Sequence, residues 1–89
     1  MIHVTKISVS GGRTTEKVKS TRGVLPCDNV DWDDARAFLQ GWVEIISVRR
    51  GAWLMVDEEG HLKSLPVNHE ATLIAGRTIV GNAIFIETV

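Results

Sequence analysis

Acidic and imidazole side chains crowd one short turn of this sequence, where they could bind a metal ion. Asp57, Glu58, Glu59 and His61 follow a strand-like segment, and His69 comes shortly afterwards. Carboxylate oxygens and imidazole nitrogens are ligands for zinc and magnesium. However, the turn lacks the alternating oxygen ligands of a calcium loop, and acids at a hairpin tip commonly serve solubility. We therefore expect these acids to lie in water, and we predict neither a metal site nor a cofactor.

A catalytic set is missing from the sequence. The chain has no Gly-x-Ser-x-Gly elbow, His-Glu-x-x-His helix, P-loop or Gly-x-Gly-x-x-Gly loop. Cys27 could act as a nucleophile only if folding brought it to one of the three histidines. Its neighbour Asp28 is expected to raise the pKa of the thiol and so to disfavour the reactive thiolate. We predict that the chain is not an enzyme.

The tryptophans and a pair of arginines supply the best candidates for a binding surface. Arg49 and Arg50 precede Trp53, which shares a strand face with a methionine. An exposed Trp–Met face beside two arginines would suit stacking or protein binding. Burial of Trp53 in a second core layer is the favoured alternative, because most tryptophans are largely buried. We expect Trp32 and Trp42 to pack in the core.

Asn68 and His69 are candidate polar contacts for the same ligand or partner. They stand where a helix is expected to begin, and free backbone N–H groups at a helix start can bind an anion. Glu70 in that first turn already offsets part of the helix dipole. For Asn68, a structural role as the helix cap is the alternative.

The segment from residue 13 to residue 22 is polar and basic, with Val18 as its one strongly apolar residue. It is expected to form either an exposed edge strand or a mobile loop. Its basic side chains could hold phosphates or an acidic partner, or they could simply be solvated. The residues concerned are Arg13, Lys17, Lys19 and Arg22.

Length and charge limit the classes of protein to which this chain can belong. Its 89 residues fit one small domain with a thin core, so we expect a homo-oligomer that covers further apolar surface. Ten basic and eleven acidic residues leave a formal net charge of −1, without the basic excess of a duplex nucleic-acid binder. Cys27 is the single cysteine, and neither a membrane span nor a signal peptide is recognisable. We therefore predict a cytoplasmic protein, in the cytoplasm of a host bacterium.

Two segments of the first half are predicted to be strands. In residues 2–9 the apolar side chains change face near Thr5 and Lys6, which a bulge or a twist at that point would explain. Residues 42–49 are mostly apolar on both faces, which is typical of a central strand. A bulged or twisted first strand and a buried central strand are therefore expected.

The second half is predicted to contain a hairpin and a closing strand. Residues 52–56 and 61–65 are expected to pair, with Gly60 at positive φ in the turn between them. The last strand, or pair of strands, is expected within residues 79–89, with a turn or bulge at Gly81.

Two short helices complete the prediction. The first covers residues 32–40, capped by Asp31 and ended by a left-handed Gly41. The second covers residues 68–75 and ends at Gly76. Together these elements predict an α+β fold, a single small domain with a mostly antiparallel sheet of four to six strands and two short helices packed on it.

Four ordered motifs occupy about residues 38 to 84. They are Gly41-Trp42-Val43-Glu44-Ile45-Ile46, Val56-Asp57-Glu58-Glu59-Gly60-His61-Leu62, Leu65-Pro66-Val67-Asn68-His69-Glu70-Ala71-Thr72 and Ile79-Val80-Gly81-Asn82-Ala83. In this order they resemble an uncharacterised family of short bacteriophage and mobile-element proteins, catalogued as domain of unknown function number 3846. Asp57 stands where the family pattern has an asparagine. The resemblance implies no catalytic or ligand residues; it implies a phage or mobile-element protein that acts inside a bacterium.

These observations lead to one predicted function and one alternative. We predict a small non-enzymatic binding protein that serves a phage or mobile element against host defence. It would capture, in stoichiometric amounts, a host immune effector or a nucleotide-type signal. The expected contacts are Arg49, Arg50 and Trp53, with Asn68 and His69 as polar partners. The alternative is a nucleic-acid-associated accessory protein that uses residues 13–22 as a flexible basic hook, which a steep loss of DNA affinity with salt would identify.

Overall fold

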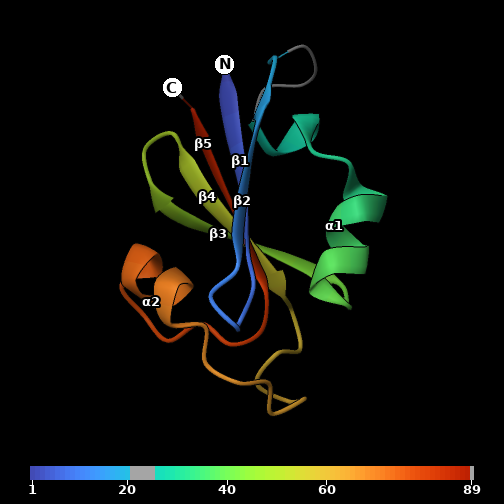
Figure 1. Ribbon diagram of the computed structural model, residues 1–89, viewed down its shortest axis with the longest axis vertical. Helices are drawn as coiled ribbons and strands as arrows, with labels where there is room; N and C mark the ends of the chain where they lie inside the picture. Colours follow the sequence, from blue (N-terminus) through green and yellow to red (C-terminus); the bar gives the residue numbers. More distant parts are fainter. Residues whose placement is uncertain (21–25, 89) are drawn as a thin grey trace.

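A five-stranded antiparallel sheet runs through the centre of the molecule, with one helix on each face (Figure 1). The computed structural model describes residues 1–20 and 26–88. The strands are β1 (Ile2–Ile7), β2 (Arg13–Val18), β3 (Val43–Arg49), β4 (Ala52–Asp57) and β5 (Ala83–Thr88). The helices are α1 (Trp32–Leu39), α2 (His69–Ala75) and a short 3-10 helix, η1 (Pro26–Asn29). The predicted α+β class, strand number and pair of short helices are confirmed.

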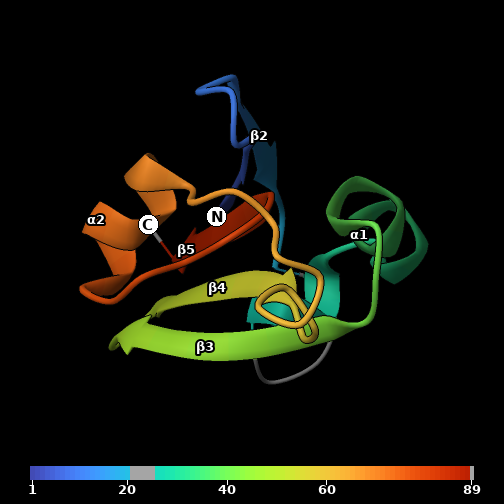
Figure 2. The same ribbon diagram turned by 90° about the horizontal axis from the view of Figure 1, so that it is seen from below.

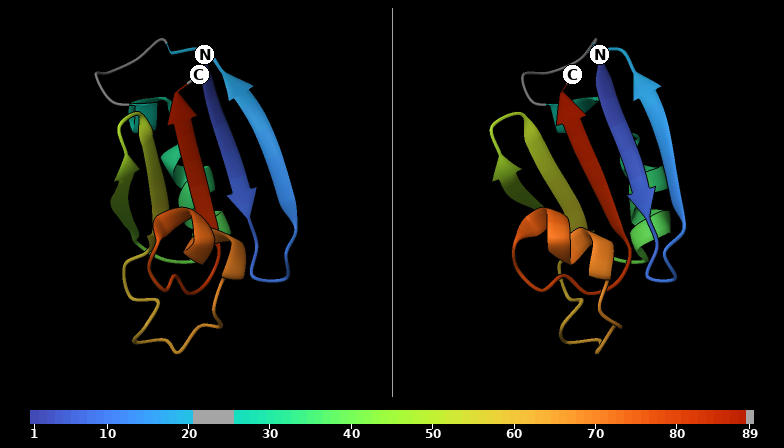
Figure 3. Two further views of the ribbon diagram at one scale, coloured as in Figure 1. Left: turned by 90° about the vertical axis from the view of Figure 1, so that its left-hand side faces the viewer. Right: turned by 60° about the vertical axis from the view of Figure 1, so that its left-hand side comes forward.

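The strands lie in the order β2-β1-β5-β4-β3, which Figure 3 shows from the side of α2. The last strand of the chain therefore occupies the middle of the sheet. It pairs with β1 on one side, where Ile2 stands opposite Thr88, and with β4 on the other, where Leu54 stands opposite Phe85. Neither described α-helix is long and apolar enough to cross a membrane.

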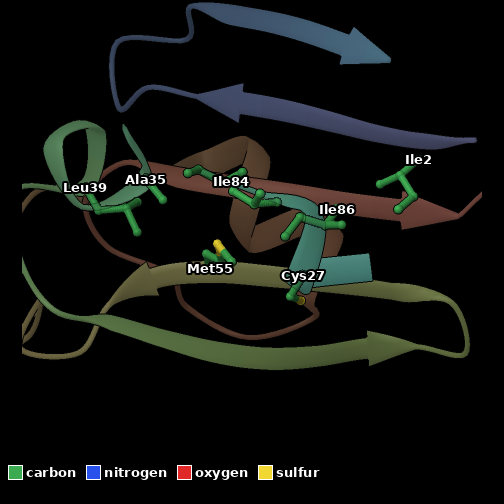
Figure 4. Packing of buried hydrophobic residues seen from close by; sticks show 8 residues of the cluster. Ile2, Cys27, Ala35, Leu39, Met55, Ile84 and Ile86 are labelled. Carbon is green, nitrogen blue, oxygen red and sulfur yellow. The ribbon is translucent and has the colours of Figure 1, made fainter. Parts of the chain in front are cut away.

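Both faces of the sheet bury apolar side chains, because α1 and η1 cover one face and α2 covers part of the other. Figure 4 shows the first cluster, in which Met55 and Ile84 from the sheet meet Leu39 of α1. Its buried members are Ile2, Cys27, Val30, Ala35, Leu39, Met55, Ile84 and Ile86. The second cluster is formed by Ile7, Ala52, Leu54, Val56, Ala71, Ile79, Ala83 and Phe85.

The predicted bulge in the first strand is wrong. β1 keeps one continuous register with β2 and with β5 from Ile2 to Ile7. Ile2 faces the α1 side and Ile7 faces the α2 side simply because alternate residues point to opposite faces. With both faces covered, the strand needs no phase change to bury both side chains.

The predicted central strand is in fact an edge strand. β3 pairs with β4 alone among the described strands, and Figure 2 shows it at the outer edge of the sheet. The register shifts between Ser47 and Arg49, so the end of β3 is bulged. At the opposite edge, residues 13–18 form β2, which confirms the edge-strand interpretation for that part of the polar segment.

The predicted strand at residues 61–65 is also wrong. This segment forms successive turns, in which Lys63 donates its N–H to Glu59 O and Leu65 donates its N–H to Gly60 O. The physical reason lies in the sheet, because β3 and β5 already occupy both sides of β4. Gly60 does not adopt a positive φ; instead, a Cβ at this position would lie 2.9 Å from Val80 Cγ2.

The helix caps agree with the sequence except at one position. Asp31 caps α1 by accepting N–H groups of the first turn, and Gly76 ends α2 in the left-handed region with φ of 73°. At the end of α1, however, Gln40 takes the left-handed conformation that was predicted for Gly41. Gly41 is needed for space, because its Cβ would lie 2.7 Å from the carboxylate of Asp57.

Candidate functional site

Two tryptophans lie at the surface, close to the edge strand β3. Trp32 is 39% exposed and Trp42 is 64% exposed, so the prediction that both pack in the core is wrong. Between them lies Arg36, whose guanidinium carbon is 5.5 Å from the centre of the Trp42 ring. An exposed cation–π contact of this kind contributes about 0.5–1 kcal/mol. These three residues line a shallow pocket together with Val43 and Glu58.

The elements that hold this pocket follow from the burial pattern of α1. Ala35 and Leu39 face the sheet and are buried, so the helix must present its other side to solvent. Trp32 and Arg36 are four residues apart and therefore share one face of the helix. Trp42 comes directly before β3, and its carbonyl accepts the N–H of Glu58 at 2.9 Å. Helix and strand thus bring the two indoles to one surface.

The strand edge extends this surface. Val43 and Ile45 are two residues apart and therefore share the α1 face of β3, where Ile45 stands opposite the buried Met55. Ile45 itself is 39% exposed. We call the set Trp32, Arg36, Trp42, Val43 and Ile45 the tryptophan surface. Exposed aromatic and aliphatic side chains that adjoin an arginine are typical of protein-binding surfaces.

Arg49, Arg50 and Trp53 do not form one surface. Trp53 is half-buried against the α1-side cluster, which agrees with the core alternative. Arg49 lies on the α2 side, where it forms an ion pair with Glu87 and stands 5.6 Å from the centre of the Phe85 ring. Arg50 is exposed in the turn after β3 and has no ion pair with any described residue. The sheet therefore separates Trp53 from Arg49.

Asn68 has a structural role. Its side chain is 1% exposed, and its Oδ1 accepts the N–H of Ala71 as the cap of α2. Its Nδ2 donates to Ile7 O at 3.1 Å and to Gly81 O at 2.9 Å. These bonds join the helix start to the end of β1 and to the connection that precedes β5, and they leave the amide no free group for a ligand. His69 follows it on the surface.

The acidic turn divides into one buried and several exposed groups. Glu58, Glu59 and His61 are exposed, whereas the expectation that Asp57 lies in water is wrong. Its side chain is 1% exposed and lies 2.7 Å from Lys63 Nζ. Within residues 1–20 and 26–88, no three His, Cys, Asp or Glu side chains are arranged to hold a metal ion.

The basic segment contributes an edge strand instead of a hook along residues 13–18. Arg13 Nη1 lies 2.5 Å from Glu70 Oε1, so this arginine ties β2 to α2. Lys17 and Lys19 are exposed. Arg22, the fourth residue of the predicted basic group, lies outside the described residues.

Cys27 lies in the α1-side core and has no feature of a catalytic thiol. It is almost completely buried. Burial raises the pKa of the Cys27 thiol, a backbone hydrogen bond lowers it in part, and the nearby charge of Asp28 raises it further. The thiol therefore stays protonated at neutral pH.

A second concave region opens on the α2 side of β3, and the sequence did not indicate it. This groove has a volume of about 430 Å³ and is lined by β3, the acidic turn and the segment after α2. Its polar lining residues are Glu44, Asp57, Glu58, His61, Arg77 and Thr78. Their mixed charges and exposure do not select one class of ligand.

Sequence reasoning missed the tryptophan surface because it assumed that tryptophan is buried. Two signals were present: Trp32 stands among Asp31, Asp33 and Asp34, and Arg36 follows it at helical spacing. Charged side chains are rarely buried, so a tryptophan that is flanked by three aspartates at a helix start is unusual for a core position. No signal marked β3 as an edge strand.

Comparison with known proteins adds no relative. No protein family, no curated protein and no solved structure matches this chain. The resemblance of residues 38–84 to domain of unknown function number 3846 stays a prediction. Function is therefore inferred from the surface chemistry of the chain itself.

Proposed function

We propose that this chain is a small, non-enzymatic binding protein that captures a protein partner in stoichiometric amounts through the tryptophan surface. One observation carries the proposal: Trp32 and Trp42 are both exposed and line one pocket, in which the guanidinium of Arg36 lies against the Trp42 ring. Tryptophan and arginine are the residue types most enriched among the residues that dominate binding energy. Leaving two indoles in water is unfavourable unless a partner covers them.

The chemistry of the surface favours a protein over a nucleotide-type signal. Among the described residues, Arg36 is the one basic side chain that lines the pocket, and it already forms an ion pair with Asp33 at 2.5 Å. Glu58 adds negative charge to the same rim. A phosphate-bearing ligand would be repelled by both acids, whereas apolar side chains of a protein would cover the indoles together with Val43 and Ile45.

The family resemblance supplies the biological setting of the proposal. In a phage or mobile element, a small capture protein would act in the bacterial cytoplasm against a host immune effector. The tryptophan surface replaces Arg49, Arg50 and Trp53 as the expected main contact, because the sheet separates Arg49 from Trp53. The nucleic-acid alternative is less favoured, since Arg13 is already paired with Glu70 and the net charge is −1.

Retention of bacterial proteins on immobilised variants tests the capture. The wild-type chain is compared with Trp42→Ala and Trp32→Ala, and with Leu73→Ala, which removes an exposed apolar side chain from α2. A true partner is retained by the wild type and by Leu73→Ala, and titration of the purified partner gives one fixed stoichiometry. We expect Trp42→Ala to weaken binding by about 30-fold or more, as loss of a dominant contact residue does. Equal retention on all four columns would contradict the proposal.

Phage infection tests the counter-defence part separately. The chain is expressed in bacterial strains that each carry one defence system, and plaques are counted with wild-type and Trp42→Ala chains. Restored plating in one strain by the wild type alone supports counter-defence. Partner capture without any effect on plating would leave a binding protein with another role.

A further inference from the structure

The two edges of the sheet differ in how they are protected. Along β2 the side chains include Arg13, Glu16 and Lys17, all exposed, and charges of this kind discourage pairing with another strand. From Val43 to Val48, β3 carries a single charged residue, Glu44. Among the described residues nothing pairs with its outer side. The edge at β3 is therefore open and largely uncharged.

The register of β3 with β4 shows which backbone groups face this open edge. Residues 42 and 58 stand opposite each other in the register that pairs Val43 with Asp57, and Glu58 donates its N–H to Trp42 O. In an antiparallel ladder the bonded pairs alternate, so residues 42, 44 and 46 bond toward β4. The N–H and C=O groups of Val43, Ile45 and Ser47 consequently point outward.

We infer that β3 pairs with β3 of a second copy of this chain, antiparallel about a twofold axis at Ile45. In this register Ile45 stands opposite Ile45 of the second copy, and Val43 stands opposite Ser47 of the second copy. All three outward-facing residues are then bonded within the regular part of the strand. The pairing of the two strands is independent of the proposed function. Only the statement about what the joined surface binds rests on the proposed function.

Charge and the bulge exclude the neighbouring registers. A shift of the axis to residue 44 would place Glu44 directly opposite Glu44 of the second copy, which is destabilising. A shift to residue 46 would place Val43 opposite Arg49, beyond the point where the register of β3 breaks. The axis at Ile45 instead sets Glu44 opposite Ile46 of the second copy. A self-complementary patch of this kind is what a twofold dimer requires.

The dimer would change the binding surface itself. A twofold axis perpendicular to the sheet keeps both α1 helices on the same face of the joined ten-strand sheet. The two tryptophan surfaces would then meet at Ile45, with Trp42 of each copy about 10 Å along the strand from the axis, and would join into one larger apolar and aromatic surface. A capture site of this form is incomplete in a single copy, so one partner would be held by two chains.

The mass of the wild-type chain, without any partner, is the first test. Sedimentation or native mass spectrometry is expected to give twice the 9.8 kDa chain mass. Ile45→Lys places a charge on the axis and is expected to give the monomer. Thr14→Lys makes the matched change on β2, at the other edge of the sheet, and is expected to remain dimeric. A monomeric wild type, or a dimer unaffected by Ile45→Lys, would overturn the inference.

Variants that each add one exposed cysteine to the buried Cys27 test the register without depending on a disruptive charge. Directly bonded antiparallel residues have Cα atoms about 5.5 Å apart, so oxidation of Ile45→Cys should link the two copies. Val43→Cys and Ser47→Cys should not, because four residues along a strand separate each from its own counterpart by about 13 Å. Linking at residue 43 or 47 in place of 45 would reject this register.

The outcomes separate this inference from the proposed function. A monomeric chain that still captures its partner through Trp42 would overturn the dimer alone. A dimer that links at residue 45 and retains no partner would overturn the capture function alone.

Discussion

Lys63 Nζ lies 2.7 Å from a carboxylate oxygen of Asp57, whose side chain is 1% exposed. The same ammonium donates to Gln40 O at 3.1 Å, and the other carboxylate oxygen accepts the N–H of Glu59. Through these contacts the ion pair joins the end of β4, the following turns and the connection between α1 and β3. Trp42 lies at the end of that connection, so its position depends on an ion pair whose carboxylate had been predicted to lie in water.

Removal of either charge should destabilise the fold. Asp57→Ala loses the ion pair and the acceptor for Glu59, and we expect the free energy of unfolding to fall by about 3–4 kcal/mol. Lys63→Met leaves the carboxylate unpaired; because Lys63 is 39% exposed, water replaces part of the lost interaction, and the loss should be about 1–2 kcal/mol. Urea unfolding measures both. Lys17→Met, an exposed control, should change stability by less than about 0.5 kcal/mol, and an equal effect of all three would contradict the buried pair.

A methyl group at Gly41 should not fit. It would lie 2.7–2.8 Å from the carboxylate atoms of Asp57, which is buried and held by Lys63 and so cannot move away. We expect Gly41→Ala to lower stability by about 2–3 kcal/mol and to shift the fluorescence of the adjacent Trp42. If Gly41→Ala lowers stability less in an Asp57→Gly background than in the wild type, the close approach to the Asp57 carboxylate is the cause. Equal damage in both backgrounds would point to another cause.

The neighbouring position should respond in the opposite direction. Gln40 holds φ of 61°, a left-handed conformation that is unfavourable for a residue with a Cβ. Gln40→Gly removes this strain, and its backbone C=O still accepts Lys63. After the larger entropy of glycine in the unfolded chain is subtracted, we expect a gain of about 0.5–1 kcal/mol. Thermal unfolding checks it, and a decrease in stability would contradict the left-handed assignment.

Asn68 should be among the most sensitive polar residues. Its amide bonds to Ala71, Ile7 and Gly81 are all lost in Asn68→Ala, and buried N–H and C=O groups are left without partners. We expect a loss of about 3–4 kcal/mol, the sum of a missing cap and unsatisfied backbone groups. His69→Ala, the exposed neighbour, should change stability by less than about 0.5 kcal/mol. If Asn68→Ala lowers the free energy of unfolding, measured with urea, by less than about 1 kcal/mol, the three hydrogen bonds of the Asn68 amide do not stabilise the fold as described.

The buried thiol makes stability depend on alkaline pH. Burial raises the pKa of Cys27 in the folded chain above its ordinary value of 9.0. Below pH 9.0 the thiol is protonated in both the folded and the unfolded chain, and the buried thiol makes its full contribution to stability. As the pH rises above it, the unfolded chain loses the proton first, so stability falls until the folded pKa is passed. The free energy of unfolding, measured with urea between pH 8 and pH 11, should therefore decline more steeply for the wild type than for Cys27→Ala.

Local features of the sequence were sufficient to predict the helices. Asp31 and Gly76 act through hydrogen bonds and backbone conformation within a few residues of each helix end, so their effects are readable in one dimension. The same is true of β2, whose consecutive polar residues suit an exposed edge. The α+β class followed from the number and kind of these elements.

Strand order could not be predicted, because it depends on pairings between distant residues. Ile45 and Ile46 look like core residues of a central strand, yet β3 lies at the edge since β5 takes the other side of β4. For the same reason residues 61–65 cannot pair with β4, whose two sides are taken by β3 and β5. Once β3 is placed at the edge, the exposure of Trp42 at its start is no longer surprising. The candidate site was missed because tryptophan was assumed to be buried and because β3 was placed in the centre of the sheet.

The central place of β5 has a consequence for how the chain folds as it is synthesised. The hairpins β1–β2 and β3–β4 are local, but only β5 joins them, and it is the last strand in the sequence. Until it leaves the ribosome, two hairpins with uncovered apolar faces must wait, and such hairpins are marginally stable on their own. Folding of the sheet should therefore wait for β5 and be rate-limited by pairings such as Ile2 with Thr88. During that delay, the largely uncharged edge at β3 can pair with a strand of another chain, which favours aggregation.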